Sequence, residues 1–296
     1  MNLKTLLTRG CVATAVAIAL VFGGQANAEP AMWVIKDADS TIYLFGSVHL
    51  LKPGLDWQSP KLTAAVKSAQ EIWFEIPNPS DQEKLVAEVL PSLMQKGLSP
   101  DKPLSSRLNT EDFAKITDRA KAIGLDPRAL DVMRPWLAAM ILSAAPIKTS
   151  GYEPSSGVEV TLERQAKAAG EEVRAFETVQ QQLAFFADLP EEVQLAYLKS
   201  VLDDKNVDGD VDKLVDAWMK ADLTALEKGA VGEAKAQSPA LYEALIAGRN
   251  KAWADRIAER LKGSGVSFIA VGAGHLVGPD SLQAQLKKRG IEVSRY

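Results

Sequence analysis

The chain contains only two histidines, and each follows a glycine by three residues. His49 follows Gly46 in residues 41–50 (TIYLFGSVHL), and His275 follows Gly272 in residues 266–276 (VSFIAVGAGHL). Imidazole is the commonest metal ligand in proteins and the usual general base near neutral pH. A glycine at the end of an apolar, strand-like run lets the backbone turn sharply. The shared context predicts that both histidines meet at one site; the alternative is two unrelated loop histidines.

Four glutamates could contribute to the same chemistry. Glu75 ends the apolar run 71–76 (EIWFEI), and a carboxylate there needs a partner or a raised pKa. It is therefore a candidate metal ligand or general base, or else a salt-bridged strand end. Glu177 follows a similar run and either supports the site or caps the next helix. Glu159 begins a helix and could point into the site, whereas Glu163, one turn later, is expected on a solvated face.

The pair Arg249-Asn250 is the remaining polar candidate. An arginine here could steady a carboxylate or a developing oxyanion, and the alternative is the start of a surface helix. The glycines near His275 also suggest a dinucleotide loop, but their spacing is one residue too long and a histidine lies within the loop. The chain has no Gly-x-Ser-x-Gly segment, so a serine nucleophile elbow is not indicated.

The elements that must position these residues form a small mixed β-sheet with flanking helices. Strands are predicted at 32–36 and 41–45 as a hairpin, then at 71–76, 172–176, 266–271 and 291–295. Helices are predicted at 61–69, 158–169 and 279–289, with large helical insertions at about 81–150 and 178–262. This is an α/β (α+β) fold, in a single domain over 29–296. Ligands in such sheets bind beyond the carboxyl ends of the strands, where the candidate residues fall.

The first 28 residues have the pattern of a secretory signal peptide. Basic Lys4 and Arg9 precede an apolar stretch, and Ala26-Asn27-Ala28 forms a cleavage site. Removing this segment leaves 32 basic and 38 acidic residues, a net charge of −6, and removes the single cysteine. The mature chain therefore excludes thiolate zinc sites and cysteine nucleophiles. We expect export, to a bacterial periplasm or as a secreted protein, with no membrane anchor in the mature chain and no nucleic-acid partner.

These residues together resemble the TraB/GumN (Tiki-like) family, which is related to the erythromycin-esterase and ChaN-like superfamily. The similarity runs in order along the mature chain. It covers 44–51 with Pro53-Gly54, 74–76, 157–159, 175–178 with Gln182-Leu183, Arg249-Asn250, and 271–278.

The resemblance implies a metal-dependent hydrolase, most simply a peptidase, acting on a peptide or small-molecule substrate. His49 and His275 would bind a divalent metal such as manganese or cobalt, and Glu75 would ligate it or activate water. Two histidines and one carboxylate also suit zinc. Two alternatives follow from the related groups. One is an esterase-like hydrolase that needs no metal and uses His49 as base, and the other is a non-catalytic haem- or metal-binding protein of the cell envelope.

Overall fold

The computed structural model describes residues 29–296 except residues 78, 205 and 206, so the predicted signal segment lies outside the described residues. Six strands form one mixed sheet in the order β4-β3-β5-β2-β1-β6. The strands are β1 Met32–Lys36, β2 Ser40–Ser47, β3 Glu71–Phe74, β4 Glu172–Ala175, β5 Gly265–Gly272 and β6 Ser294–Arg295. The predicted small mixed sheet is confirmed.

The pairing of the strands brings distant parts of the chain to one edge of the sheet. β1 and β2 form the predicted antiparallel hairpin, which turns where the Asp37 carboxylate accepts the backbone N–H of Ser40. β2, β5, β3 and β4 are parallel to one another. In the β2–β5 pair, Gly46 lies opposite Val271 and Ser47 opposite Gly272. The carboxyl ends of these strands therefore meet at a common edge.

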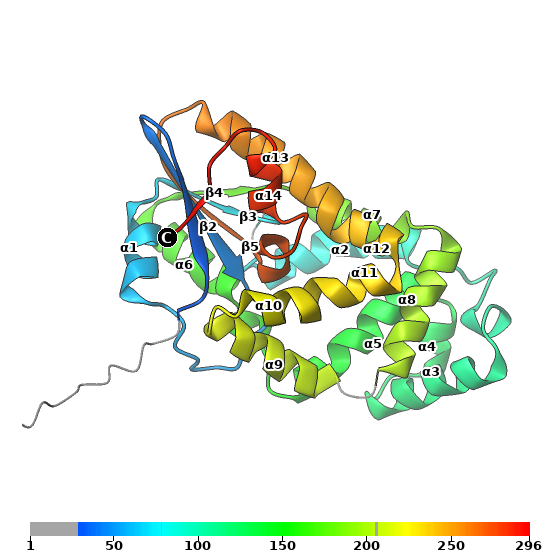
Figure 1. Cartoon of the computed structure of the whole chain (residues 1–296). Coiled ribbons are helices and arrows are strands. Elements are labelled where there is room, and N and C mark those ends of the chain that lie inside the picture. Colours follow the sequence, from blue (N-terminus) through cyan, green and yellow to red (C-terminus); the bar gives the residue numbers. More distant parts are fainter. Residues whose placement is uncertain (1–28, 78, 205–206) are drawn as a thin grey trace, which may run out of the picture.

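Helices cover the sheet and extend away from it on one side, where α3, α4, α5 and α8 lie (Figure 1). The sheet-flanking helices are α1 Pro60–Ser68, α6 Val158–Ala169, α13 Gly248–Leu261 and α14 Leu282–Lys287. The first insertion contains α2 Gln82–Lys96, α3 Thr110–Ala122, α4 Pro127–Asp131 and α5 Pro135–Thr149. The second contains α7 Val179–Ala187, α8 Glu191–Asp203, α9 Val207–Met219, α10 Leu223–Leu226, α11 Glu233–Gln237, α12 Pro239–Tyr242 and the π-helical turns η3 Glu227–Gly232 and η4 Glu243–Ala247. Both predicted insertions are thus helical, and among the described residues no helix is long and apolar enough to cross a bilayer.

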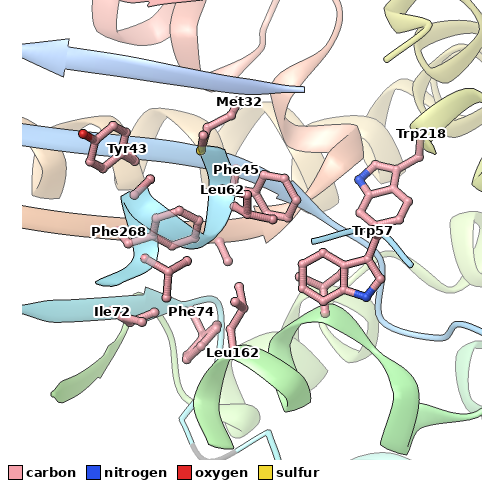
Figure 2. Packing of buried hydrophobic residues seen from close by; sticks show 14 of the residues in the cluster. Met32, Tyr43, Phe45, Trp57, Leu62, Ile72, Phe74, Leu162, Trp218 and Phe268 are labelled. Atoms are coloured by element: carbon pink, nitrogen blue, oxygen red, sulfur yellow. The ribbon is translucent and has the colours of Figure 1, made fainter. Parts of the chain in front are cut away.

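The central strands β2, β3 and β5 are buried on both faces of the sheet. On one face, Phe45 packs 6.0 Å from the rings of both Trp57 and Phe268 (Figure 2). Ile42 and Leu44 point to the other face and join the cluster around Trp253. Parallel strands covered on both faces read as continuous apolar runs, as 42–45 does. Side chains that emerge just beyond these strands consequently start from a rigid base.

Candidate functional site

The two histidines and Glu75 surround one point at the edge of the sheet. His49 follows β2, Glu75 follows β3, and His275 lies in a 3₁₀ turn directly after β5. A methyl group placed on Gly272 would lie 3.1 Å from Glu75 Oε1, 3.7 Å from His49 Nε2 and 3.7 Å from His275 Cδ2. The structure thus brings together three side chains that are far apart in the sequence.

His49 is oriented by Glu159. The Nδ1 atom of His49 lies 2.7 Å from Glu159 Oε1, which also accepts a short hydrogen bond from the Ser47 hydroxyl. The Glu159 carboxylate raises the pKa of His49 to about 9, although desolvation opposes the shift. Burial alone would raise the pKa of Glu159, but the attraction of His49 and the Ser47 hydrogen bond outweigh it and hold this pKa below its usual value. The side chain of His49 remains 64% exposed.

The position of Glu159 follows from the start of α6. The backbone N–H of Val158 donates to the carbonyl of Val48 at 3.0 Å. A Cβ atom on Gly157 would collide with the carbonyl of His49. Only a glycine lets the first turn of α6 approach the histidine loop this closely, and Glu159 consequently lies in contact with His49.

His275 is oriented by Asn250. The Nδ2 atom of Asn250 donates to the carbonyls of His275 and Asp280, at 3.2 and 2.8 Å, which leaves its Oδ1 facing His275 Nδ1 at 2.7 Å. His275 Nδ1 must therefore carry a proton, and Nε2 presents its lone pair. Burial lowers the pKa of His275 to about 3. The Glu75 carboxylate opposes this shift, and Arg249 and His49 add to it. The ring is neutral across the physiological range.

Arg249 links the remaining polar groups. Its guanidinium donates to Glu75 Oε2 at 2.5 Å, to both carboxylate oxygens of Glu177, to His275 Nε2 at 3.1 Å and to the carbonyl of Leu245. Each of the five N–H groups then has an internal acceptor. Oxyanion binding by Arg249 therefore requires it to exchange one of these partners, and in this arrangement its contacts position Glu75, Glu177 and His275.

Glu75 is held as an anion. Its Oε1 accepts the backbone N–H of Gly272 at 2.7 Å, and its Oε2 accepts from Arg249 and from Gln182 Nε2 at 3.0 Å. Burial would raise the pKa of Glu75, but Arg249, the two histidines and the Gly272 amide together hold it far below its usual value. Glu75 is consequently suited to pairing with a cation.

Three contributors were not singled out from the sequence. Ser47 bonds Glu159, Gln182 bridges Glu75 and Glu177, and Trp253 donates its indole N–H to Glu177 Oε1 at 2.8 Å. Trp253 also lies 4.6 Å beneath the Arg249 guanidinium. The sequence did carry a signal for Trp253. It lies four residues after Arg249, and residues four apart share one face of a helix.

Gly46 and Gly272, the glycines three residues before each histidine, matter for space rather than for backbone freedom. Neither Gly46 nor Gly272 has a positive φ, so the expected need for a sharp glycine turn is wrong. A Cβ on Gly46 would lie 3.2 Å from Ala273 Cα. Gly46 therefore allows the segment that leads to His49 to contact the segment that leads to His275. Gly272 leaves room for the carboxylate of Glu75.

The expectation that Glu163 lies on a solvated face is wrong. Its side chain is fully buried, accepts the backbone N–H of Ser80 at 2.6 Å and pairs with Lys167 at 2.8 Å. The chain that follows β3 folds over this part of α6, and spacing along a helix does not indicate such a cover.

Comparison with known proteins identifies the family of the chain. A family model described as the TraB/PrgY/gumN family matches residues 31–295. The chain belongs to the TraB/PrgY/gumN family. It is 22% identical over 280 residues to an uncharacterized protein of Treponema pallidum, covering 89% of this chain and 82% of that protein. It is also 22% identical over 259 residues to the uncharacterized protein YbaP of Escherichia coli, covering 87% and 92%. No solved structure matches the chain.

The donor chemistry of this TraB/PrgY/gumN site suits a divalent cation. Among the described residues, no group of three or more His, Cys, Asp or Glu side chains is already arranged around a metal position. His275 Nε2 instead contacts Arg249 and lies 3.8 Å from Glu75 Oε1. Both imidazoles are nevertheless anchored through Nδ1, as metal-ligating histidines usually are, and both Nε2 atoms flank Glu75. In this arrangement His275 Nε2 is engaged by Arg249, so a cation would have to displace that contact.

A cleft of about 210 Å³ opens beside these residues. Its polar wall consists of His49, Glu75, Glu159 and Gln182. Its apolar wall includes Phe74, Ile76, Leu85 and Val160. The cleft therefore joins the histidine and carboxylate cluster to an apolar surface.

Proposed function

We propose that this chain is a metal-dependent hydrolase in which His49, His275 and Glu75 hold one divalent cation, with manganese, cobalt and zinc as candidates. The observation that carries the proposal is the matched orientation of the histidines. Each binds an acceptor through Nδ1, and each directs Nε2 to the space beside Glu75. Such outer contacts fix the tautomer of a ligating imidazole and raise its basicity.

The charge balance of the contacting cluster supports the same proposal. Glu75, Glu159 and Glu177 contribute three negative charges, and Arg249 contributes one positive charge. With both imidazoles neutral, the cluster carries a net charge of −2. All three carboxylates are largely buried, and buried charges require compensation. Without a metal, protonation of His49 supplies one of the two positive charges that the cluster needs. One divalent cation would supply both.

A cation at this position would supply Lewis-acid activation of water and of a carbonyl group. Glu75, held anionic by Arg249 and the Gly272 amide, would stabilise positive charge there. Glu159 would keep the proton of His49 on Nδ1, so that the lone pair of Nε2 stays available to the cation. The apolar wall suits a substrate with an apolar group next to the scissile bond. A peptidase is the reaction class that the Tiki-like resemblance favours, and the predicted signal peptide favours the periplasm.

The test is a peptidase and esterase screen of the mature chain, before and after exhaustive chelation, with manganese, cobalt or zinc added back. We expect hydrolysis that is lost on chelation, restored by one of these metals, and abolished in His49→Ala and His275→Ala. Arg164→Ala, an exposed change on the distal part of α6, is the matched control. Full activity after chelation would instead support the esterase-like alternative with His49 as base. A Soret band on haem titration that disappears in His275→Ala would support the haem-binding alternative.

A further inference from the structure

A second cavity lies between α7 and α13 and shares no lining residue with the cleft. Its volume is about 670 Å³, against about 210 Å³ for the cleft. The α7 wall extends from Gln181 to Asp188, and the α13 wall from Gly248 to Arg256. The α13 wall is about 12 Å long at 1.5 Å per residue. This groove has the volume typical of pockets that enclose small organic ligands.

The floor of the groove is aromatic. Phe176 and Trp253 stack with their ring centroids 5.2 Å apart, and Phe185 lines the opposite side. Trp253 is 1% exposed and Phe176 7% exposed, so the open apolar surface of the groove comes mainly from Phe185, Ala184 and Ala252. The groove therefore favours a flat apolar body over a strongly hydrated one.

The charged groups around the groove differ in whether they have partners. Glu177 is paired with Arg249, and Asp188 is paired with Lys96 at 2.9 Å. Within the part of the chain that the structure describes, Arg256 has no carboxylate within 4.0 Å.

The surroundings of Arg256 leave its charge available to a ligand. Its guanidinium donates to the carbonyl of Phe176 and lies 5.3 Å from the Phe176 ring. Burial and nearby Arg174 lower the pKa of Arg256, although Glu177 opposes them. One end of the groove thus carries a cation without a bound anion. The exposed Glu243 lies on the helical turn that leads into α13, toward the other end.

We propose that this groove is a second ligand site, which binds an amphipathic anion. The apolar body of the ligand lies against Phe185, Ala184 and Ala252, and its carboxylate or sulfonate pairs with Arg256. Glu243 repels a second anionic group, so the ligand has its charge at one end only. Glu177 and Arg249 of the proposed metal site also line one side of this groove, but the pairing of the ligand with Arg256 does not require the proposed hydrolase activity.

The test uses 1-anilinonaphthalene-8-sulfonate, an aromatic anion of this class, in fluorescence and calorimetric titrations of the mature chain. We expect saturable binding at one site. Arg256→Gln should weaken binding about tenfold through loss of a charge-assisted contact. Ala252→Trp, an exposed change that fills the groove, should abolish the saturable signal. Far-UV circular dichroism checks that both variants are folded.

Met94→Glu is the control for binding elsewhere, because Met94 is 62% exposed on the apolar stripe of α2. It should bind the dye with the wild-type dissociation constant. Absence of saturable binding by the wild type would overturn the proposal. So would binding that Arg256→Gln leaves unchanged, or binding that Met94→Glu abolishes.

Discussion

The His49–Glu159 pair allows a quantitative test, because the chain has only two histidines and their pKa values move in opposite directions. In the metal-free protein, Glu159 raises the pKa of His49 to about 9, whereas burial lowers that of His275 to about 3. Replacing Glu159 with Gln keeps the size of the side chain and removes its charge. We expect the pKa of His49 to fall by about 1 to 2 units, since an opposite charge in contact shifts a pKa by about 1–3 units.

The same pair makes a pH-dependent contribution to stability. A histidine whose pKa is raised on folding stabilises the protein fully below the unfolded value of 6.5, and this contribution is lost as the pH rises through about 9. Each unit corresponds to about 1.4 kcal/mol. Because 64% of the His49 side chain is exposed, solvent screening reduces the contribution to about 1 kcal/mol.

The assay is an NMR titration of the histidine ring resonances between pH 4 and 10 after removal of metals. One resonance should titrate near pH 9 and shift toward 6.5 in Glu159→Gln, whereas the second should not titrate in this range and so provides an internal reference. A wild-type His49 that titrates near 6.5, or one that Glu159→Gln leaves unchanged, would refute the assigned pairing.

Three further predictions concern the groups around Glu75. Arg249→Met should destabilise the metal-free protein by about 3–5 kcal/mol in urea denaturation, because two buried carboxylates lose their cation; added manganese should restore part of that loss, and no change in the urea midpoint would contradict this role. Stability should fall as the pH drops from 6.5 toward 3, because the unfolded chain protonates His275 while the folded protein keeps it neutral; His275→Gln should flatten this dependence, and an unchanged slope would contradict the burial effect. Gly272→Ala should cost about 1–3 kcal/mol in thermal denaturation and weaken metal binding, because its methyl group would lie 3.1 Å from Glu75 Oε1; Gly274→Ala, whose nearest neighbour would be 3.6 Å away, should be tolerated, and equal losses in both variants would contradict the crowding at Gly272.

The sequence was most informative where local chemistry determines structure. Apolar runs that end in glycine or proline predicted the strands, and the shared Gly-x-x-His context predicted that two distant segments would meet. The parallel β2–β5 pairing, with Ser47 opposite Gly272, brings them together. That register could not be predicted from the residues, because strand partners far apart in sequence are chosen by packing on both faces of the sheet.

Contacts made by side chains from the insertions were the least predictable. Gln182 and Trp253 bind the site carboxylates, but neither the family-like segment that contains Gln182 nor the spacing of Trp253 from Arg249 specifies these contacts. Glu163 is buried because a distant segment covers it. Such contacts depend on how helices dock, which periodicity along a single helix does not specify.

The most direct test of the account is the metal stoichiometry of the mature chain, measured by isothermal titration calorimetry and elemental analysis. We predict one divalent cation per wild-type chain, and loss of binding in both His49→Ala and His275→Ala but not in Arg164→Ala. No bound cation in the wild type, or a cation retained by both histidine variants, would contradict the claim that the paired Nε2 atoms and Glu75 form a metal site.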